Sequence, residues 1–151
     1  MSTINVPRVQ DFVVGKGFFK RVEDLVRDGV IPYQWEALND RVPDAESSHC
    51  IENFRIAAGE SHGEYYGMVF QDSDVAKWLE AVAYSLASKP NADLEQTADE
   101  VIALIGRAQK PDGYLNTYYT VKEPGKRCTN LRDCHELVVR WPHDGGRRGL
   151  L

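Results

Sequence analysis

Two consecutive stretches with a helical spacing of apolar residues constrain the fold of this chain more than any other feature of its sequence. In residues 75–86 and 94–108, apolar side chains recur every three or four positions, which places them on one face of a helix. They are Val75, Trp78, Leu79, Val82 and Leu86 in the first stretch, and Leu94, Ala98, Val101, Ile102, Ile105 and Ala108 in the second. The predicted start and stop signals are Ser73 and Pro90 for the first helix, with Asn91 or Asp93 opening the second. The pair predicts an antiparallel helical hairpin, and each stripe needs a partner surface because burying one large apolar side chain contributes about 1.5–3 kcal/mol.

Weaker signals on either side of this hairpin predict further helices and one turn. A helix is expected from Phe18 to Val26, with Gly29 ending it, and a shorter one follows with Pro32 in its first turn. A third is expected over residues 48–58, capped by Ser47 or Ser48 and ended by Gly59. After the hairpin, residues 111–113 (Pro-Asp-Gly) predict a type I turn, from which Tyr114 and Leu115 return to pack on the hairpin. No stretch alternates with the period of a strand, so the predicted class is all-α.

Composition narrows the functional classes. A chain of 151 residues that is 42% hydrophobic is long enough for one globular domain. A net charge of −5 argues against nucleic acid and anionic membrane surfaces as partners. No apolar run reaches the length of a membrane span, and the first ten residues lack the apolar core of a signal peptide, so the predicted compartment is the cytoplasm.

The three cysteines, Cys50, Cys128 and Cys134, are an odd set without a C-x-x-C pair. Cys128 and Cys134 have one neighbouring soft ligand, His135, whereas structural zinc sites usually show two closely spaced pairs. Reduced thiols are therefore the favoured interpretation, and a zinc site is the weaker alternative.

Several polar residues are candidates for chemistry, each with a structural alternative. Asp72 and Asp74 precede or open a helix, where carboxylates stabilise the positive end of the helix dipole, and this role is favoured over a catalytic dyad. Gln71 could face a cleft. A glycine-flanked segment holds Glu60, His62 and Glu64, for which a solvated surface loop is favoured over a polar pocket.

Two histidines, His49 and His135, each stand at an expected helix start. Imidazole both donates and accepts hydrogen bonds, so His135 beside Glu136 could bind a hydroxylated ligand. A structural role is the alternative for an isolated histidine. The chain contains no G-x-S-x-G, H-E-x-x-H, P-loop or dinucleotide-binding motif.

Five long strings together resemble the N-terminal part of glycoside hydrolase family 127, whose founding activity is β-L-arabinofuranosidase. They are VIPYQWEALND, SHCIENFRIAAGE, GMVFQDSDVAKWLEAVAYSLA, RAQKPDGYLNTYYT and CHEL, in that order along the chain. The resemblance covers residues 17–137 and implies an (α/α)6 barrel catalytic domain, followed in the family by β-sandwich domains. It implies removal of non-reducing terminal L-arabinofuranose with retention, by a cysteine nucleophile that zinc activates and a separate glutamate acid/base.

The resemblance assigns few functional residues to this chain. The family's nucleophile, zinc-binding and acid/base motifs lie beyond this chain, so we expect no catalytic residue and no metal ligand here, and zinc only in the full-length family. Of the substrate-contacting residues, the histidine of the "HE" motif maps onto His135, while the family's glutamine in the loop after "ND" has no clear counterpart.

The predicted function is therefore that of a truncated glycoside hydrolase that resembles non-reducing-end β-L-arabinofuranosidase and is inactive alone. The expected partners are glycans containing L-arabinofuranosides, together with a downstream half of the barrel or a second copy of the chain. A small helical carbohydrate-binding or protein-interaction domain without catalysis is the alternative.

The predicted organisation is a lead-in over residues 1–16, an incomplete (α/α)6 barrel over 17–137, and an aberrant tail over 138–151. In the family, "HEL" continues into a helix, whereas this chain continues with Val-Val-Arg-Trp-Pro-His-Asp-Gly-Gly. Codons permitted for residues 140–151, read one nucleotide later, encode Ala-Gly-His-Met-Met-Glu-Ala-Ala-Val-Ala-Phe, which is the family's helix. We therefore expect a one-base insertion or deletion near codons 137–139. A native basic tail with three arginines is the alternative.

Overall fold

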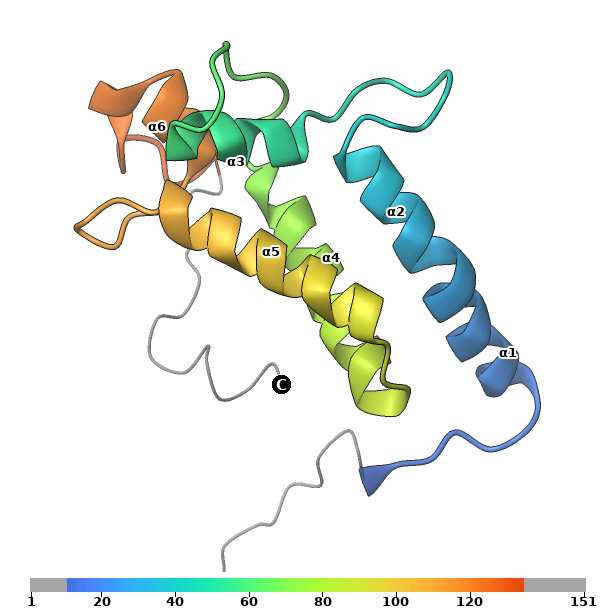
Figure 1. Ribbon diagram of the computed structural model, residues 1–151. Helices are drawn as coiled ribbons and strands as arrows, with labels where there is room; N and C mark the ends of the chain where they lie inside the picture. The colour runs from blue at the N-terminus through green and yellow to red at the C-terminus, as the bar shows by residue number, and fades with distance from the viewer. Residues whose placement is uncertain (1–10, 135–151) are drawn as a thin grey trace, which may run out of the picture.

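The computed structural model describes residues 11–134, and within this range the chain is helical and has no strand. This confirms the all-α prediction for the described residues. The helices in chain order are α1 (Phe18–Leu25), the π-helical η2 (Val26–Val30), α2 (Ile31–Leu38), α3 (Cys50–Ala58), α4 (Asp72–Ser88), α5 (Ala92–Ala108), α6 (Thr117–Val121) and the 3-10 turn η3 (Pro124–Lys126) (Figure 1).

The predicted hairpin is α4 and α5. Asn91 is the N-cap of α5, since its side-chain oxygen accepts hydrogen bonds from the backbone N–H groups of Asp93 and Leu94, both at 3.1 Å. The buried members of the two stripes are Val75, Trp78, Leu79 and Val82 on α4, and Ala98, Val101, Leu104 and Ala108 on α5. Most of the predicted stripes are thus confirmed.

Ile102 was assigned to the buried stripe, and this is wrong, because its side chain is 41% exposed. Leu104 is buried instead. The physical reason is that α5 packs against both α3 and α4, so its buried face includes Leu104, one helical turn after Val101.

Helix α4 lies between α2 and α5 (Figure 1). On the α2 side, the rings of Trp35 and Trp78 stack with centroids 4.7 Å apart. The indole N–H of Trp78 donates a hydrogen bond of 3.1 Å to the backbone carbonyl of Ile31. A buried aromatic pair with its polar atom satisfied therefore fixes the long N-terminal helix to the hairpin.

The expected helix end at Gly29 is wrong. Helix α1 continues through η2 into α2, and the backbone N–H of Ile31 donates to the carbonyl of Val26, five residues earlier. Pro32 lies in the first turn of α2, as predicted, and lacks an N–H of its own. The π-helical register accommodates this break in the hydrogen-bond ladder, and glycine costs a helix only about 1 kcal/mol.

Two predicted caps also lie one or two residues away from their expected places. The N-cap of α4 is Gln71, so Ser73 lies within the first turn. The N-cap of α3 is His49, although the Ser48 hydroxyl accepts a hydrogen bond of 3.3 Å from the backbone N–H of Cys50. The predicted end of α3 at Gly59 is confirmed, because this glycine has φ 79°.

The predicted turn after α5 is present, with the Gly113 N–H donating to the Lys110 carbonyl at 2.8 Å. Leu115 packs against the core as expected, whereas the ring of Tyr114 lies 3.6 Å from the Arg127 guanidinium carbon. Among the described residues, no helix is both long and apolar enough to cross a membrane. The predicted tail, most of the predicted lead-in, and His135 lie outside the described residues.

Candidate functional site

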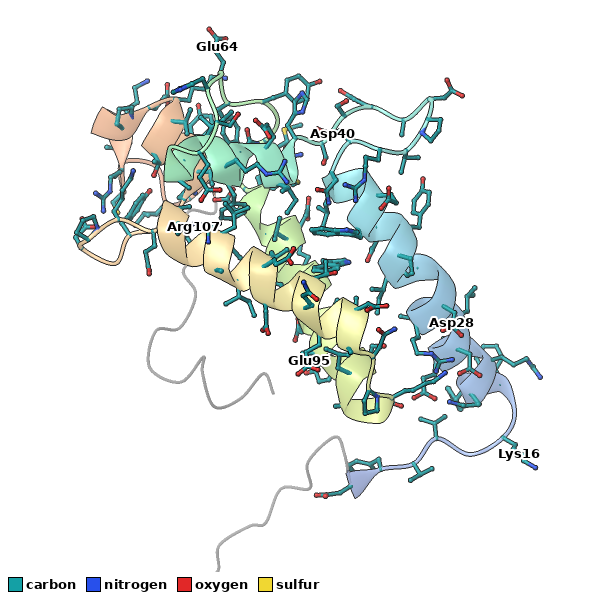
Figure 2. The ribbon with its side chains drawn as sticks, in the orientation of Figure 1. Lys16, Asp28, Asp40, Glu64, Glu95 and Arg107 are labelled. Atoms are coloured by element: carbon teal, nitrogen blue, oxygen red, sulfur yellow. The ribbon has the colours of Figure 1, made fainter. Side chains whose placement is uncertain are left out.

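The polar residues with the most specific arrangement lie in two loops at one end of the molecule. Residues 39–49 connect α2 to α3, and residues 59–71 connect α3 to α4. Both loops extend from the same end of the helices, with Asp40 in the first and Glu64 in the second (Figures 1 and 2). The first loop ends at the start of α3, and the second ends at the start of α4.

Asp40 closes the base of the first loop. It terminates α2 with φ 60°, while its backbone N–H and that of Arg41 donate to the carbonyls of Ala37 and Glu36. Its carboxylate accepts hydrogen bonds from the backbone N–H groups of Ser48 at 2.7 Å and His49 at 2.8 Å. Partial burial alone would raise the pKa of Asp40, but these bonds and the one from the His49 ring outweigh it and hold the pKa below its ordinary value.

The imidazole of His49 is held by the same carboxylate. Its Nδ1 lies 2.5 Å from Asp40 Oδ2, and its ring meets the Tyr66 ring edge-on, with centroids 4.7 Å apart. The side chain of His49 is 39% exposed. Because a carboxylate only accepts, Nδ1 carries the proton, which leaves Nε2 to face other groups.

The backbone of Tyr66 is held by hydrogen bonds to a buried amide side chain. The side chain of Asn53, which is 1% exposed, donates to the Tyr66 carbonyl at 2.8 Å and accepts from the Tyr66 N–H at 3.2 Å. The Tyr66 hydroxyl donates to Glu46 Oε1 at 3.1 Å, which joins the second loop to the first. The ring of Tyr66 is nevertheless 45% exposed, so it is ordered but accessible.

Gln71 has a structural task rather than the cleft position considered from the sequence. Its amide nitrogen donates to the Ser48 carbonyl at 2.5 Å, and its amide oxygen accepts from the Met68 N–H at 2.8 Å. Gly67 makes room for it with φ 99°, since a Cβ at this position would lie 1.8 Å from Gln71 Oε1. Gln71 therefore joins the start of α3 to the loop before α4.

The two aspartates at the start of α4 differ from each other. Both lie in its first turn, as expected, and Asp74 is exposed and pairs with Lys77 at 3.1 Å. Asp72 is 3% exposed, and it accepts from the Thr117 N–H at 2.6 Å and from the Thr117 hydroxyl. Burial raises the pKa of Asp72 to about 6, only partly offset by these bonds. Sequence reasoning missed this contact with α6.

The other candidates are dispersed. His62 and Glu64 are exposed, in agreement with a surface loop, and Glu60 forms an ion pair with Arg107 of α5. His135 lies outside the described residues, but Cys134 before it is described. Burial raises the pKa of Tyr118 in α6. The Tyr118 ring meets Tyr65 of the second loop, with centroids 5.1 Å apart, so α6 lies at the end of the molecule that carries both loops.

The cysteines do not fit a zinc site in the described part of the chain. Residues 11–134 contain no group of three or more His, Cys, Asp or Glu side chains placed to hold a metal ion. Cys50 is buried beside the Gln71 carbonyl, whereas Cys128 is exposed. Burial raises the pKa of the Cys50 thiol to about 11, so it is protonated at neutral pH and is a poor nucleophile or ligand.

An apolar groove of about 500 Å³ lies away from this polar cluster. It is formed between the lead-in, α1 and the C-terminal half of α4, and its lining includes Phe12, Val14, Val26, Ala81 and Tyr84. Its lining is mostly apolar, so it resembles an uncovered packing surface more than a site for a sugar.

Comparison with known proteins identifies the family of this helical arrangement. The family model of the β-L-arabinofuranosidase GH127 catalytic domain matches residues 12–140. The chain belongs to glycoside hydrolase family 127. A curated relative, the non-reducing end β-L-arabinofuranosidase of Bifidobacterium longum subsp. longum, is 44% identical over 138 residues, which cover 81% of this chain and 21% of that protein.

Solved structures agree with this assignment. A GH127 β-L-arabinofuranosidase from Geobacillus stearothermophilus T6 superposes with a TM-score of 0.83 and 72% identity, over 84% of this chain and 20% of that one. A further GH127 β-arabinofuranosidase superposes with a TM-score of 0.73 and 28% identity, over 85% of this chain and 21% of that one. The chain thus spans about one fifth of the length of these relatives. Its helices correspond to part of an (α/α)6 barrel, as predicted.

Proposed function

We propose that this family 127 chain forms the opening part of a catalytic domain that removes non-reducing terminal β-L-arabinofuranosyl residues. The observation that carries the proposal is the match to the GH127 catalytic domain over residues 12–140, combined with the small share of each relative that the chain spans. In this proposal the chain contributes substrate contacts, among them His135, and the groups that break the bond come from the rest of the catalytic domain. The substrates would be glycans with terminal L-arabinofuranosides.

Zinc chemistry belongs to the missing part of the domain in this proposal. The described residues hold no three donors at one place, and the buried thiol of Cys50 is protonated at neutral pH. The 151-residue chain alone should therefore not hydrolyse arabinofuranosides, because positioning of a substrate without nucleophile or acid supplies only part of the rate enhancement. The cytoplasm is the proposed compartment, which the three free cysteines favour.

A reconstitution assay tests this proposal. Release of L-arabinose from an aryl β-L-arabinofuranoside is measured for the purified chain, for the complementary remainder of the Geobacillus relative, and for the two combined. We expect release only from the combination, and a lower rate when the chain carries His135→Ala. Release by the chain alone would contradict the proposal, as would a stable complex of the two parts that hydrolyses other glycosides but not this one.

A protein-interaction role is the second candidate, and the surface of α1 favours it. This helix buries none of its residues, and Phe18, Phe19 and Leu25 are 64%, 75% and 64% exposed. Together with the apolar groove beside it, α1 presents a surface that a soluble monomer rarely leaves uncovered. Analytical ultracentrifugation should detect self-association that Phe19→Glu reduces. If the wild-type chain remains monomeric at every concentration measured, self-association through α1 is excluded.

A further inference from the structure

The first loop concentrates unusual backbone conformations. Four non-glycine residues of the described chain have positive φ, and three of them, Asp40, Asp44 and His49, lie within residues 39–49. Such a conformation costs a non-glycine residue free energy, and a chain retains this cost where the surrounding contacts enforce it, commonly at ligand-binding sites. Glycine would relieve the strain at Asp40 but would remove the carboxylate.

In this backbone conformation, the Asp40 carboxylate orients the His49 side chain. It holds both the backbone N–H and the ring Nδ1 of His49, so the imidazole has a fixed position and a fixed proton on Nδ1. Within the described part of the chain, no hydrogen bond is found at Nε2, and the ring is 39% exposed. An oriented imidazole of this kind presents a hydrogen-bonding atom to a ligand at little further entropic cost.

The second loop adds an aromatic face and a carboxylate beside this imidazole. The Tyr66 ring contacts the His49 ring, and its hydroxyl binds one oxygen of Glu46. The other Glu46 oxygen remains as an acceptor on an exposed side chain. An imidazole, a carboxylate and an exposed aromatic ring together match a small polyhydroxylated ring, whose hydroxyls donate and whose C–H groups pack on the aromatic face.

We propose that His49, Glu46 and Tyr66 form a sugar-binding site in which His49 Nε2 and Glu46 hold hydroxyl groups of a pentofuranose against the Tyr66 ring. For the identity of the sugar, this inference rests on the proposed function. Asp40 is a positioning residue in this site, because it acts through the His49 ring and does not touch the sugar.

NMR titration of the 151-residue chain with methyl β-L-arabinofuranoside tests the site. The chain has four histidines, so the ring signals of His49 can be assigned by substitution. We expect a saturable shift at His49 Nε2 with millimolar affinity. Tetrahydrofurfuryl alcohol, which has the same ring without the ring hydroxyls, should produce no such shift.

The decisive variant is His49→Asn. Asparagine tolerates positive φ, and its amide N–H can replace Nδ1 at Asp40, but it has no counterpart of Nε2. Far-UV circular dichroism and the thermal midpoint should therefore stay close to wild type, while sugar binding should weaken by about tenfold or more. Asp40→Asn should also weaken binding, with loss of order in the loop signals.

The outcomes separate this inference from the proposed function. Saturable binding of a different furanoside at His49, and none of the arabinofuranoside, would support the site and contradict the proposed substrate. The inference is overturned if His49 does not respond to any of these sugars, or if folded His49→Asn binds as tightly as the wild type. In that case His49 only closes the loop, and the reconstitution assay still decides the proposed function.

Discussion

Replacing Asp72 by asparagine should change how the stability of this family 127 chain depends on pH. The carboxyl of Asp72 is 3% exposed and accepts two hydrogen bonds from Thr117, which ties α4 to α6. Burial raises its pKa from 3.8 to about 6. A group with a higher pKa in the folded state binds its proton more tightly there. Its stabilising contribution is therefore complete below about pH 3.8 and is lost as the pH rises through about 6.

The size of the effect follows from this shift. A difference of about two pKa units corresponds to roughly 3 kcal/mol between the two limits, and roughly 1.3 kcal/mol of it appears between pH 7 and pH 5. Carboxylates with a lowered pKa, such as Glu36 and Asp112, stabilise the fold at high pH instead. Their stabilising contributions are lost only as the pH falls below their ordinary pKa values of 4.5 and 3.8. The range from about pH 5 to 7 thus avoids the titration of these carboxylates, and the comparison with Asp72→Asn isolates the contribution of Asp72.

The assay is urea unfolding followed by tryptophan fluorescence at pH 5, 6 and 7, since Trp35 and Trp78 stack in the core. The wild type should gain stability on acidification, and Asp72→Asn should not, because the amide does not titrate. Asp74→Asn is the matched control, since Asp74 lies in the same helical turn but its side chain is 52% exposed. If Asp72→Asn gains as much stability as the wild type between pH 7 and pH 5, the pKa argument for Asp72 is wrong.

Three further predictions concern the core, the second loop and the tail. Trp78→Phe should destabilise the chain by about 1–3 kcal/mol in urea unfolding, because the Ile31 carbonyl loses its donor, whereas Tyr84→Phe on the exposed side of α4 should have little effect. Gly67→Ala should destabilise the chain by at least about 1–3 kcal/mol, since Gln71 must move. The control Gly106→Ala, within α5 and with open space around it, should stabilise the chain by about 0.5–1 kcal/mol. Equal effects of the two alanines would refute the close-contact argument. Sequencing the gene across codons 137–139 should reveal a one-base insertion or deletion, and an intact frame without downstream family sequence would refute the out-of-frame tail.

Much of the fold was predictable because its signals are local. The stripes on α4 and α5, the breaker Pro90 and the cap Asn91 act within a few residues, and they placed the hairpin almost to the residue. The end expected at Gly29 failed for a physical reason. A glycine weakens a helix only slightly, and the π-helical η2 carries the chain past it.

The candidate site was less accessible to sequence reasoning. His49 was recognised as a histidine at a helix start, but its partners Asp40 and Tyr66 are 9 and 17 residues away and belong to different loops. The one local signal was an aspartate directly after the C-cap of α2, Asn39, at a position where helices usually end in glycine or asparagine. The ion pair of Glu60 with Arg107, like the burial of Asp72 against Thr117, has no local signal.

The sequence by itself determined the helical class, most helix ends and the family, because periodicity, capping and long characteristic strings are properties of neighbouring residues. Only the tertiary structure decided which polar groups share one environment. It buried Asp72, left α1 uncovered and brought the two loops together, because packing joins residues that are far apart along the chain. Hydrogen bonding and desolvation set the charge of Asp40 and Asp72 and the orientation of the His49 ring, and both depend on those distant neighbours.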